Sequence, residues 1–138
     1  MSLPNNITPY ELGKLGEKFA IDYLKRSGYK IAQKGFRLFR GDIDIIAYDR
    51  KVLVFIEVKT RRGNRFGLPE ESVHPSKQKK IRKIAQGFIS LNKLEEEECR
   101  FDILALDYNE NKGFKVTHFK DAFKPWLFIK KADIFIKK

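Results

Sequence analysis

The chain has 138 residues, the length of one compact domain. Its 29 Lys and Arg against 18 Asp and Glu give a formal charge of +11, which favours an anionic partner, nucleic acid before an acidic membrane surface. One cysteine excludes an internal disulfide and a thiolate-rich zinc site. The first ten residues hold no apolar run and no stretch is long enough to span a bilayer, which predicts a cytoplasmic protein without stable membrane insertion.

The first element expected is a helix. Thr8 is placed to cap its start, with Pro9 at the first helical position and Glu11 three residues after the cap. Gly28 is expected as the C-cap. Apolar side chains recur between these ends at helical spacing: Leu12, Leu15, Phe19, Ala20, Tyr23 and Leu24.

Extended segments are expected at 29–39, 43–48 and 52–58, and the last two are almost wholly apolar, as in strands buried on both faces. A loop over 61–73, a second helix from its cap Ser76 to about Leu94, and strands at 101–107 and 114–119 complete the chain. This order predicts an α/β fold, a three-layer sandwich with a central mixed β-sheet in which the strand after the second helix pairs parallel with an earlier one. The domain is expected to cover residues 1–123, and residues 124–138 form an aromatic, basic extension.

Charged residues follow the apolar run of the third strand. Glu57 and Lys59 alternate with the core positions and share a face with Phe55. If residues 49–50 form a two-residue hairpin loop, Asp44 of the preceding strand lies opposite Phe55 and diagonal to Glu57, with Cα atoms about 7–8 Å apart. Two carboxylates and an ammonium group are therefore expected in one small patch.

Such a patch suits a hard divalent cation. Burial and mutual repulsion both disfavour ionised carboxylates, and Mg²⁺, which takes carboxylate and water ligands, would relieve both effects. Lys59 would then orient or activate a water, and Glu17 of the first helix, with small residues a turn away on either side, could reach the same patch. The alternatives are a salt bridge between Glu57 and Lys59 or Asp44, and a surface Glu17 paired with a neighbouring lysine.

Several ordered motifs together resemble the YraN family. They are Gly13-x-x-Gly16-Glu17, then Gly41-Asp42-Ile43-Asp44-Ile45-Ile46-Ala47, then Val54-Phe55-Ile56-Glu57-Val58-Lys59-Thr60-Arg61, followed by Phe66-Gly67, Ser72-Val73 with Lys77-Gln78, and Arg100-Phe101-Asp102. The likeness runs from about residue 10 to residue 123. That family is similar to the restriction-endonuclease-like superfamily and, within it, to archaeal Holliday junction resolvases.

The resemblance implies a nuclease site. Asp44 matches the motif aspartate of the superfamily, and Glu57 with Lys59 matches its acidic-x-Lys pair. Glu17 matches the acidic residue on the first helix of the resolvase branch, and Gln78 matches, loosely, an extra polar residue on the second helix. The chain departs from the pattern at residue 43, where Ile replaces Pro. The implied metal is Mg²⁺, or Mn²⁺ in its place, held by Asp44, Glu57 and the Val58 carbonyl.

Two basic clusters are expected to contact DNA phosphates. They contain Arg61, Arg62 and Arg65 after the third strand and Lys77, Lys79 and Lys80, beside Gln78, on the second helix. Phe66, between two glycines, could stack on a base, or could instead plug the core. A solvated helix face is the alternative for the second cluster.

The function expected is a metal-dependent DNA endonuclease that hydrolyses phosphodiesters, including those of branched or structured DNA. A catalytically silent nucleic-acid-binding protein on the same fold is the alternative, and a membrane-surface or interaction protein working through the tail is a third. A resolvase role would require a two-fold homodimer to cut both strands.

Overall fold

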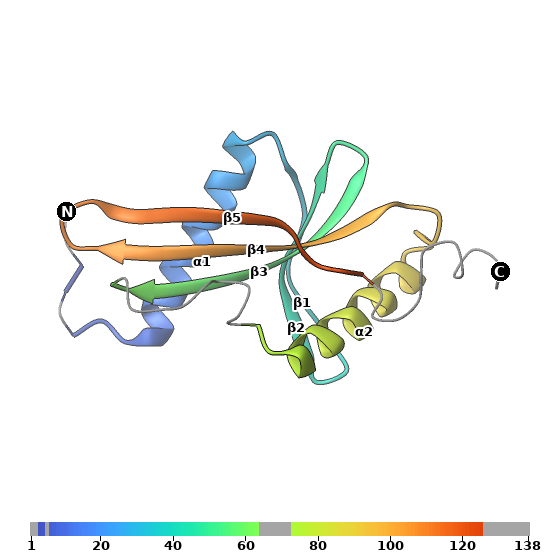
Figure 1. The fold of residues 1–138 in the computed structure, drawn as a ribbon, viewed down its shortest axis with the longest axis horizontal. Helices are drawn as coiled ribbons and strands as arrows, with labels where there is room; N and C mark the ends of the chain where they lie inside the picture. The colour runs from blue at the N-terminus through green and yellow to red at the C-terminus, as the bar shows by residue number, and fades with distance from the viewer. Residues whose placement is uncertain (1–2, 5, 64–72, 126–138) are drawn as a thin grey trace.

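The computed structural model describes residues 3–4, 6–63 and 73–125 (Figure 1). Its elements in chain order are α1 (Pro9–Arg26), β1 (Lys30–Leu38), β2 (Gly41–Asp49), β3 (Val52–Arg62), α2 (Pro75–Leu91), β4 (Cys99–Asn109) and β5 (Gly113–Phe123). The expected order of helix, three strands, helix and two strands is confirmed. Neither helix in this part of the chain is long and apolar enough to cross a bilayer.

The five strands form one mixed sheet in the order β1-β2-β3-β4-β5. Only β3 and β4 run parallel, and α2 lies in the connection between them, as expected for a crossover. Neighbouring residues of β3 enter different cores: Phe55 packs with the α2 residues Ile84 and Phe88, whereas Ile56 packs with Leu24 of α1. The two helices therefore cover opposite faces of the sheet, which confirms the three-layer α/β arrangement.

The N-cap expected for α1 is present, whereas the other three expected helix ends are displaced by one to three residues. The Thr8 side chain accepts from the Glu11 N–H and the Glu11 side chain accepts from the Thr8 N–H, which is a complete capping box. The C-cap is Ser27, and Gly28 follows it at a φ of +93°. At α2 the cap is His74, whose Nδ1 accepts from the Ser76 N–H, so Ser76 lies inside the helix rather than capping it.

Helix α2 also ends at Leu91, three residues before the expected end at Leu94. Strand β1 is one residue shorter at each end than expected, whereas the other four strands extend beyond their expected ends. Strand β3 runs to Arg62, so Arg61 lies in the sheet rather than in the expected loop. Residues 64–72 of that expected loop, which include Arg65 and Phe66, lie outside the described residues, as do residues 126–138 of the extension.

Strands β2 and β3 form the expected hairpin in a different register. Asp49 pairs with Val52, so residues 50–51 form the turn instead of residues 49–50. The pairing is shifted by two positions from the expected one. Each side chain therefore stays on its expected face of the sheet but lies opposite a different residue. The next positions after the last pair, Ile45 with Ile56, are Asp44 and Glu57, so Asp44 comes beside Glu57 rather than opposite Phe55.

Candidate functional site

The site begins where β2 and β3 separate. Their pairing stops at Ile45 and Ile56, although β2 stays paired with β1 down to Gly41 and β3 stays paired with β4 up to Arg62. Figure 1 shows β1 and β2 diverging from the other three strands, with α2 across them. Because the sheet forks here, side chains at the fork can approach backbone groups that would otherwise bond to a neighbouring strand.

Asp44 occupies the fork. Its Oδ2 accepts a hydrogen bond of 2.8 Å from the backbone N–H of Val58. Burial, followed by the nearby charge of Glu57, raises the pKa of Asp44 to about 8, and the Val58 hydrogen bond offsets only part of that rise. Near neutral pH this carboxyl group is therefore largely protonated and shares a hydrogen bond with Glu57.

Glu57 is the more deeply buried of the two carboxylates, with 7% of its surface exposed. Its Oε2 forms an ion pair with the ammonium group of Lys77, which is in the first turns of α2. Burial lowers the pKa of Lys77, but the hydrogen bond to Glu57 and the charges of Glu57 and Asp44 outweigh this and raise it. Lys77, expected only as a phosphate contact, thus lies directly at the carboxylate pair.

Lys59 lies at the same place, two residues after Glu57 on β3. Burial and then the positive charge of Lys77 lower the pKa of Lys59, although Glu57 acts in the opposite direction. The alternative expected for Glu57 was a salt bridge with Lys59, but within the described residues Glu57 forms its ion pair with Lys77. Lys59 is therefore a lysine that gives up its proton more readily than a surface lysine does.

Glu17 approaches the site from the other face of the sheet. Helix α1 crosses β3 closely at Gly16, where a Cβ atom would lie 2.1 Å from Thr60 Oγ1. The charge of Glu17 contributes to the raised pKa of Asp44, so the two carboxylates are within electrostatic range. Glu17 also lies 4.0 Å from Lys14, as its alternative interpretation predicted, and its side chain is 41% exposed.

The residues expected to contact DNA divide into two groups. Lys79 and Lys80 are exposed on α2. Arg62 is instead committed to an ion pair with Glu110. Gln78 accepts from Arg82 at 3.4 Å and donates to the Val73 carbonyl, so it is partly buried and holds the start of α2 rather than facing solvent.

The two basic clusters, separate in the sequence, meet at the carboxylate pair. Lys77 of α2 contacts Glu57, and the charge of Lys77 acts on Lys59 of β3. Arg61 continues β3 from Lys59 and is partly exposed. Positive side chains therefore surround the point where β2 and β3 separate, where Asp44 and Glu57 lie.

The donor set at the fork consists of oxygen atoms. In the described residues no group of three or more His, Cys, Asp or Glu side chains is arranged to hold a metal ion. Asp44 and Glu57 form a pair. The Val58 carbonyl belongs to the same residue whose N–H donates to Asp44. Two carboxylates, a carbonyl and water ligands match the chemistry of Mg²⁺, which keeps several waters in protein sites.

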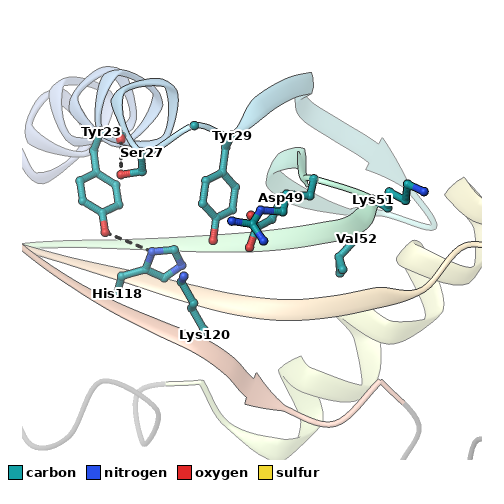
Figure 2. A pocket seen from close by; sticks show the side chains of 10 residues that line it. Tyr23, Ser27, Tyr29, Asp49, Lys51, Val52, His118 and Lys120 are labelled. Carbon is teal, nitrogen blue, oxygen red and sulfur yellow. Dashed lines mark hydrogen bonds between the residues drawn. The ribbon is translucent and has the colours of Figure 1, made fainter.

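A second polar cluster contains Arg100 and Asp102, two residues of a quoted motif for which the sequence predicted no role. Asp102 is buried in β4, where it accepts hydrogen bonds from Arg100 and His118 (Figure 2 shows His118). The sequence carries one signal for this cluster. Arg100 and Asp102 are charged residues two positions apart in an apolar strand, as Glu57 and Lys59 are in β3. The hydrogen bond of His118 joins it to a carboxylate sixteen residues away, and no regular sequence spacing predicts such a contact.

Comparison with known proteins identifies the family. Residues 16–106 match the model of the uncharacterised protein family UPF0102. A UPF0102 protein of Thermodesulfovibrio yellowstonii is 49% identical over 113 residues, covering 82% of this chain and 96% of the relative. One from Caldanaerobacter subterraneus is 45% identical, with 81% and 93% covered, and one from Chlorobium limicola is 43% identical, with 83% and 93% covered. This chain therefore belongs to the UPF0102 family, the YraN family that its motifs resemble.

Proposed function

We propose that this protein is a metal-dependent DNA endonuclease that binds Mg²⁺ between Asp44 and Glu57. One observation carries the proposal: two carboxylates lie side by side where β2 and β3 stop pairing, and the pKa of Asp44 is raised to about 8. Such an arrangement lowers the stability of the fold at neutral pH, which is typical of a functional site. A divalent cation would stabilise both charges at once.

The described residues fit distinct roles in phosphodiester hydrolysis. Asp44, Glu57 and the Val58 carbonyl would hold the cation, which would supply Lewis-acid stabilisation of the phosphate charge. Lys59, with its lowered pKa, would take a proton at Nζ from an attacking water or hydrogen-bond that water. Glu17 would add negative charge from the α1 side, and Lys77 would move from Glu57 to a phosphate oxygen when the cation binds.

Nucleic acid is the substrate class that best fits the surroundings of the pair. The net charge is +11, and Lys79 and Lys80 are exposed on α2 in the same helix as Lys77. Each lysine that reaches a phosphate adds a salt-dependent increment to DNA affinity. Cutting both strands of a four-way junction would require two such sites related by a two-fold axis. If the substrate is branched DNA, we therefore propose that the protein acts as a homodimer.

Phe39 is a further candidate for contact with DNA bases. It is 51% exposed in the β1–β2 turn, where Phe39 and Arg40 both adopt left-handed backbone conformations, with φ of 53° and 60°. Lys83 Nζ lies 4.9 Å from the centre of its ring. An exposed aromatic ring among cations, held by a strained turn, suits stacking on an unpaired base.

A cleavage screen tests the proposal. Linear, flapped and four-way DNA would be incubated with the protein and Mg²⁺ or Mn²⁺, beside Glu57→Gln and the control Asp22→Asn, which changes an exposed carboxylate of α1. Cleavage by the wild type and the control, with at least a hundredfold loss in Glu57→Gln, is the expected result. DNA binding without cleavage of any substrate would contradict the proposal and favour a silent DNA-binding protein.

A further inference from the structure

A second site lies at the start of β3, away from Glu57. An open pocket of about 980 Å³ is bounded by the end of α1, the β2–β3 turn and β5 (Figure 2). Its lining consists mainly of aromatic, hydroxyl-bearing and cationic side chains, and those that matter here are Tyr23, Tyr29, Asp49, Lys51, His118 and Lys120. None of these residues belongs to the proposed metal site.

A buried charge network lies beneath the pocket. Asp102 is 1% exposed and accepts from Arg100 Nε at 2.8 Å, from His118 Nε2 at 2.8 Å and from the Asp121 N–H at 3.0 Å. Burial raises the pKa of Asp102, but the hydrogen bonds from His118 and Arg100 outweigh it and lower the pKa, so the carboxylate is ionised. His118 Nδ1 in turn lies 3.2 Å from the Tyr23 hydroxyl, as Figure 2 shows.

This network orients the polar groups of the pocket wall. Arg100 Nη2 donates to the Tyr29 hydroxyl oxygen at 2.8 Å, which leaves the hydroxyl hydrogen of Tyr29 able to donate to a ligand. Burial raises the pKa of Tyr29 to about 12, so this hydrogen is retained at any physiological pH. The rings of Tyr23 and Tyr29 lie 5.7 and 5.8 Å from the His118 ring and form an aromatic wall.

Buried ion pairs contribute little net stability compared with an apolar packing of the same volume. A fully satisfied network that fixes a histidine and two tyrosines beside an open pocket is, however, the supporting layer that a binding site requires. The core on this face of the sheet is otherwise apolar. The network is therefore better explained by the pocket than by the stability of the fold.

The charge at the pocket selects an anion. Asp49 is paired with Arg100 at 3.2 Å, whereas Arg50, Lys51 and Lys120 add three positive charges to the lining. Figure 2 shows Lys120 extending beside His118. A ligand that carries a phosphate and a flat ring could contact Lys120 through the phosphate and Tyr23 and Tyr29 through the ring.

We infer that this pocket binds a nucleoside 5′-phosphate group, with its phosphate at Lys120 and its base or sugar against Tyr23 and Tyr29. The group could come from a free nucleotide or from the 5′-phosphorylated end of a strand, which present the same chemistry. The inference does not depend on the proposed nuclease function, because it uses no residue of the metal site.

Calorimetric titration of the full chain tests this inference. The probes are adenosine 5′-monophosphate, inorganic phosphate, and a four-residue oligonucleotide with a 5′-phosphate or a 5′-hydroxyl. Lys120→Ala and Tyr29→Phe are each expected to weaken binding about tenfold, the loss that corresponds to one hydrogen bond with the ligand. Lys115→Ala changes an exposed lysine of the same strand and should bind as the wild type does.

The probes separate the two sources. Adenosine monophosphate binding more tightly than the oligonucleotide identifies a free nucleotide, and the reverse order with a requirement for the 5′-phosphate identifies a strand end. If no phosphate-bearing probe binds, or if Lys120→Ala and Tyr29→Phe bind like Lys115→Ala, the inference is wrong. Asp44→Asn should leave this binding unchanged, so failure here and failure of the nuclease proposal are distinguishable.

Discussion

The backbone N–H of Val58 donates to a carboxylate oxygen of Asp44 at 2.8 Å, at the point where β2 no longer pairs with β3. A side chain thus satisfies a strand N–H that has lost its backbone partner. The same bond fixes the Asp44 carboxyl group beside Glu57. The fork in the sheet and the carboxylate pair are therefore one feature, and a change at Asp44 should alter both stability and function.

Stability should depend on pH through Asp44. Its pKa is about 8 in the folded chain and near 3.8 when exposed, so the folded state binds the extra proton between these values. Stability from this group is then fully present below pH 4 and is lost as the pH rises towards 8. Asp44→Asn, which keeps the acceptor for Val58, removes this loss, so its advantage over the wild type should grow by about 1.4 kcal/mol per pH unit and reach about 5 kcal/mol at pH 8.

Urea unfolding at pH 5, 6, 7 and 8 without divalent cations measures this effect. The difference in unfolding free energy between Asp44→Asn and the wild type should grow with pH. Parallel curves for the two proteins would show that the Asp44 pKa is not raised. Asp22→Asn, at an exposed position of α1, provides the comparison for a carboxylate without burial.

Lys77 should compete with a bound cation. Its ammonium group contacts Glu57, and a cation at the carboxylate pair would have to replace that charge. Lys77→Gln should therefore bind Mn²⁺ severalfold more tightly and lose about 1 kcal/mol of stability without metal, because Glu57 is left without its partner. Lys79→Gln, at an exposed neighbouring position, should change neither quantity. Weaker Mn²⁺ binding in Lys77→Gln would show that Lys77 supports the cation instead.

The approach of α1 to β3 should depend on Gly16. A Cβ at Gly16 would lie 2.1 Å from Thr60 Oγ1, so Gly16→Ala is expected to destabilise the fold by about 1–3 kcal/mol. Gly13 lies one turn earlier in the same helix, and its Cβ would meet nothing within 4 Å. Gly13→Ala should therefore stabilise the fold by about 0.5–1 kcal/mol. Equal thermal shifts for the two variants would contradict this packing.

Phe39 should contribute to DNA binding and not to stability. On the proposal above, Phe39→Ala should weaken binding to flapped or four-way DNA about tenfold, the value of one base stacked on an aromatic ring, with little effect on fully paired DNA. The control is Leu91→Ala, since Leu91 is likewise an exposed apolar residue but lies at the end of α2. Fluorescence anisotropy measures both. An equal loss of affinity on paired and branched DNA would show that Phe39 does not stack on an unpaired base.

The sequence was sufficient for the element order and the carboxylate pair because both follow from local patterns. Alternation along β3 placed Glu57 and Lys59 on one face, and the short turn joined β2 to β3. The register was wrong by two residues because Asp49 pairs with Val52, and turn residues 50–51 carry no glycine that would mark them.

Contacts between distant elements could not be predicted from these patterns. Lys77 reaches Glu57 only because α2 begins near the middle of β3, and no pattern in either segment predicts this contact. The cluster of Asp102, His118 and Tyr23 joins β4, β5 and α1 through hydrogen bonds between residues far apart in the chain. Charged residues inside apolar strands were the usable signal, but their partners depend on packing.

Binding of a divalent cation at Asp44 and Glu57 is the central claim, and calorimetric titration with Mn²⁺ tests it most directly. Titrations of the wild type, Asp44→Asn and Asp22→Asn would be run at pH 8, where Asp44 is about half ionised without metal. We expect saturable binding by the wild type and by Asp22→Asn, and a loss of at least tenfold in affinity for Asp44→Asn. Indistinguishable isotherms for the wild type and Asp44→Asn would contradict the claim.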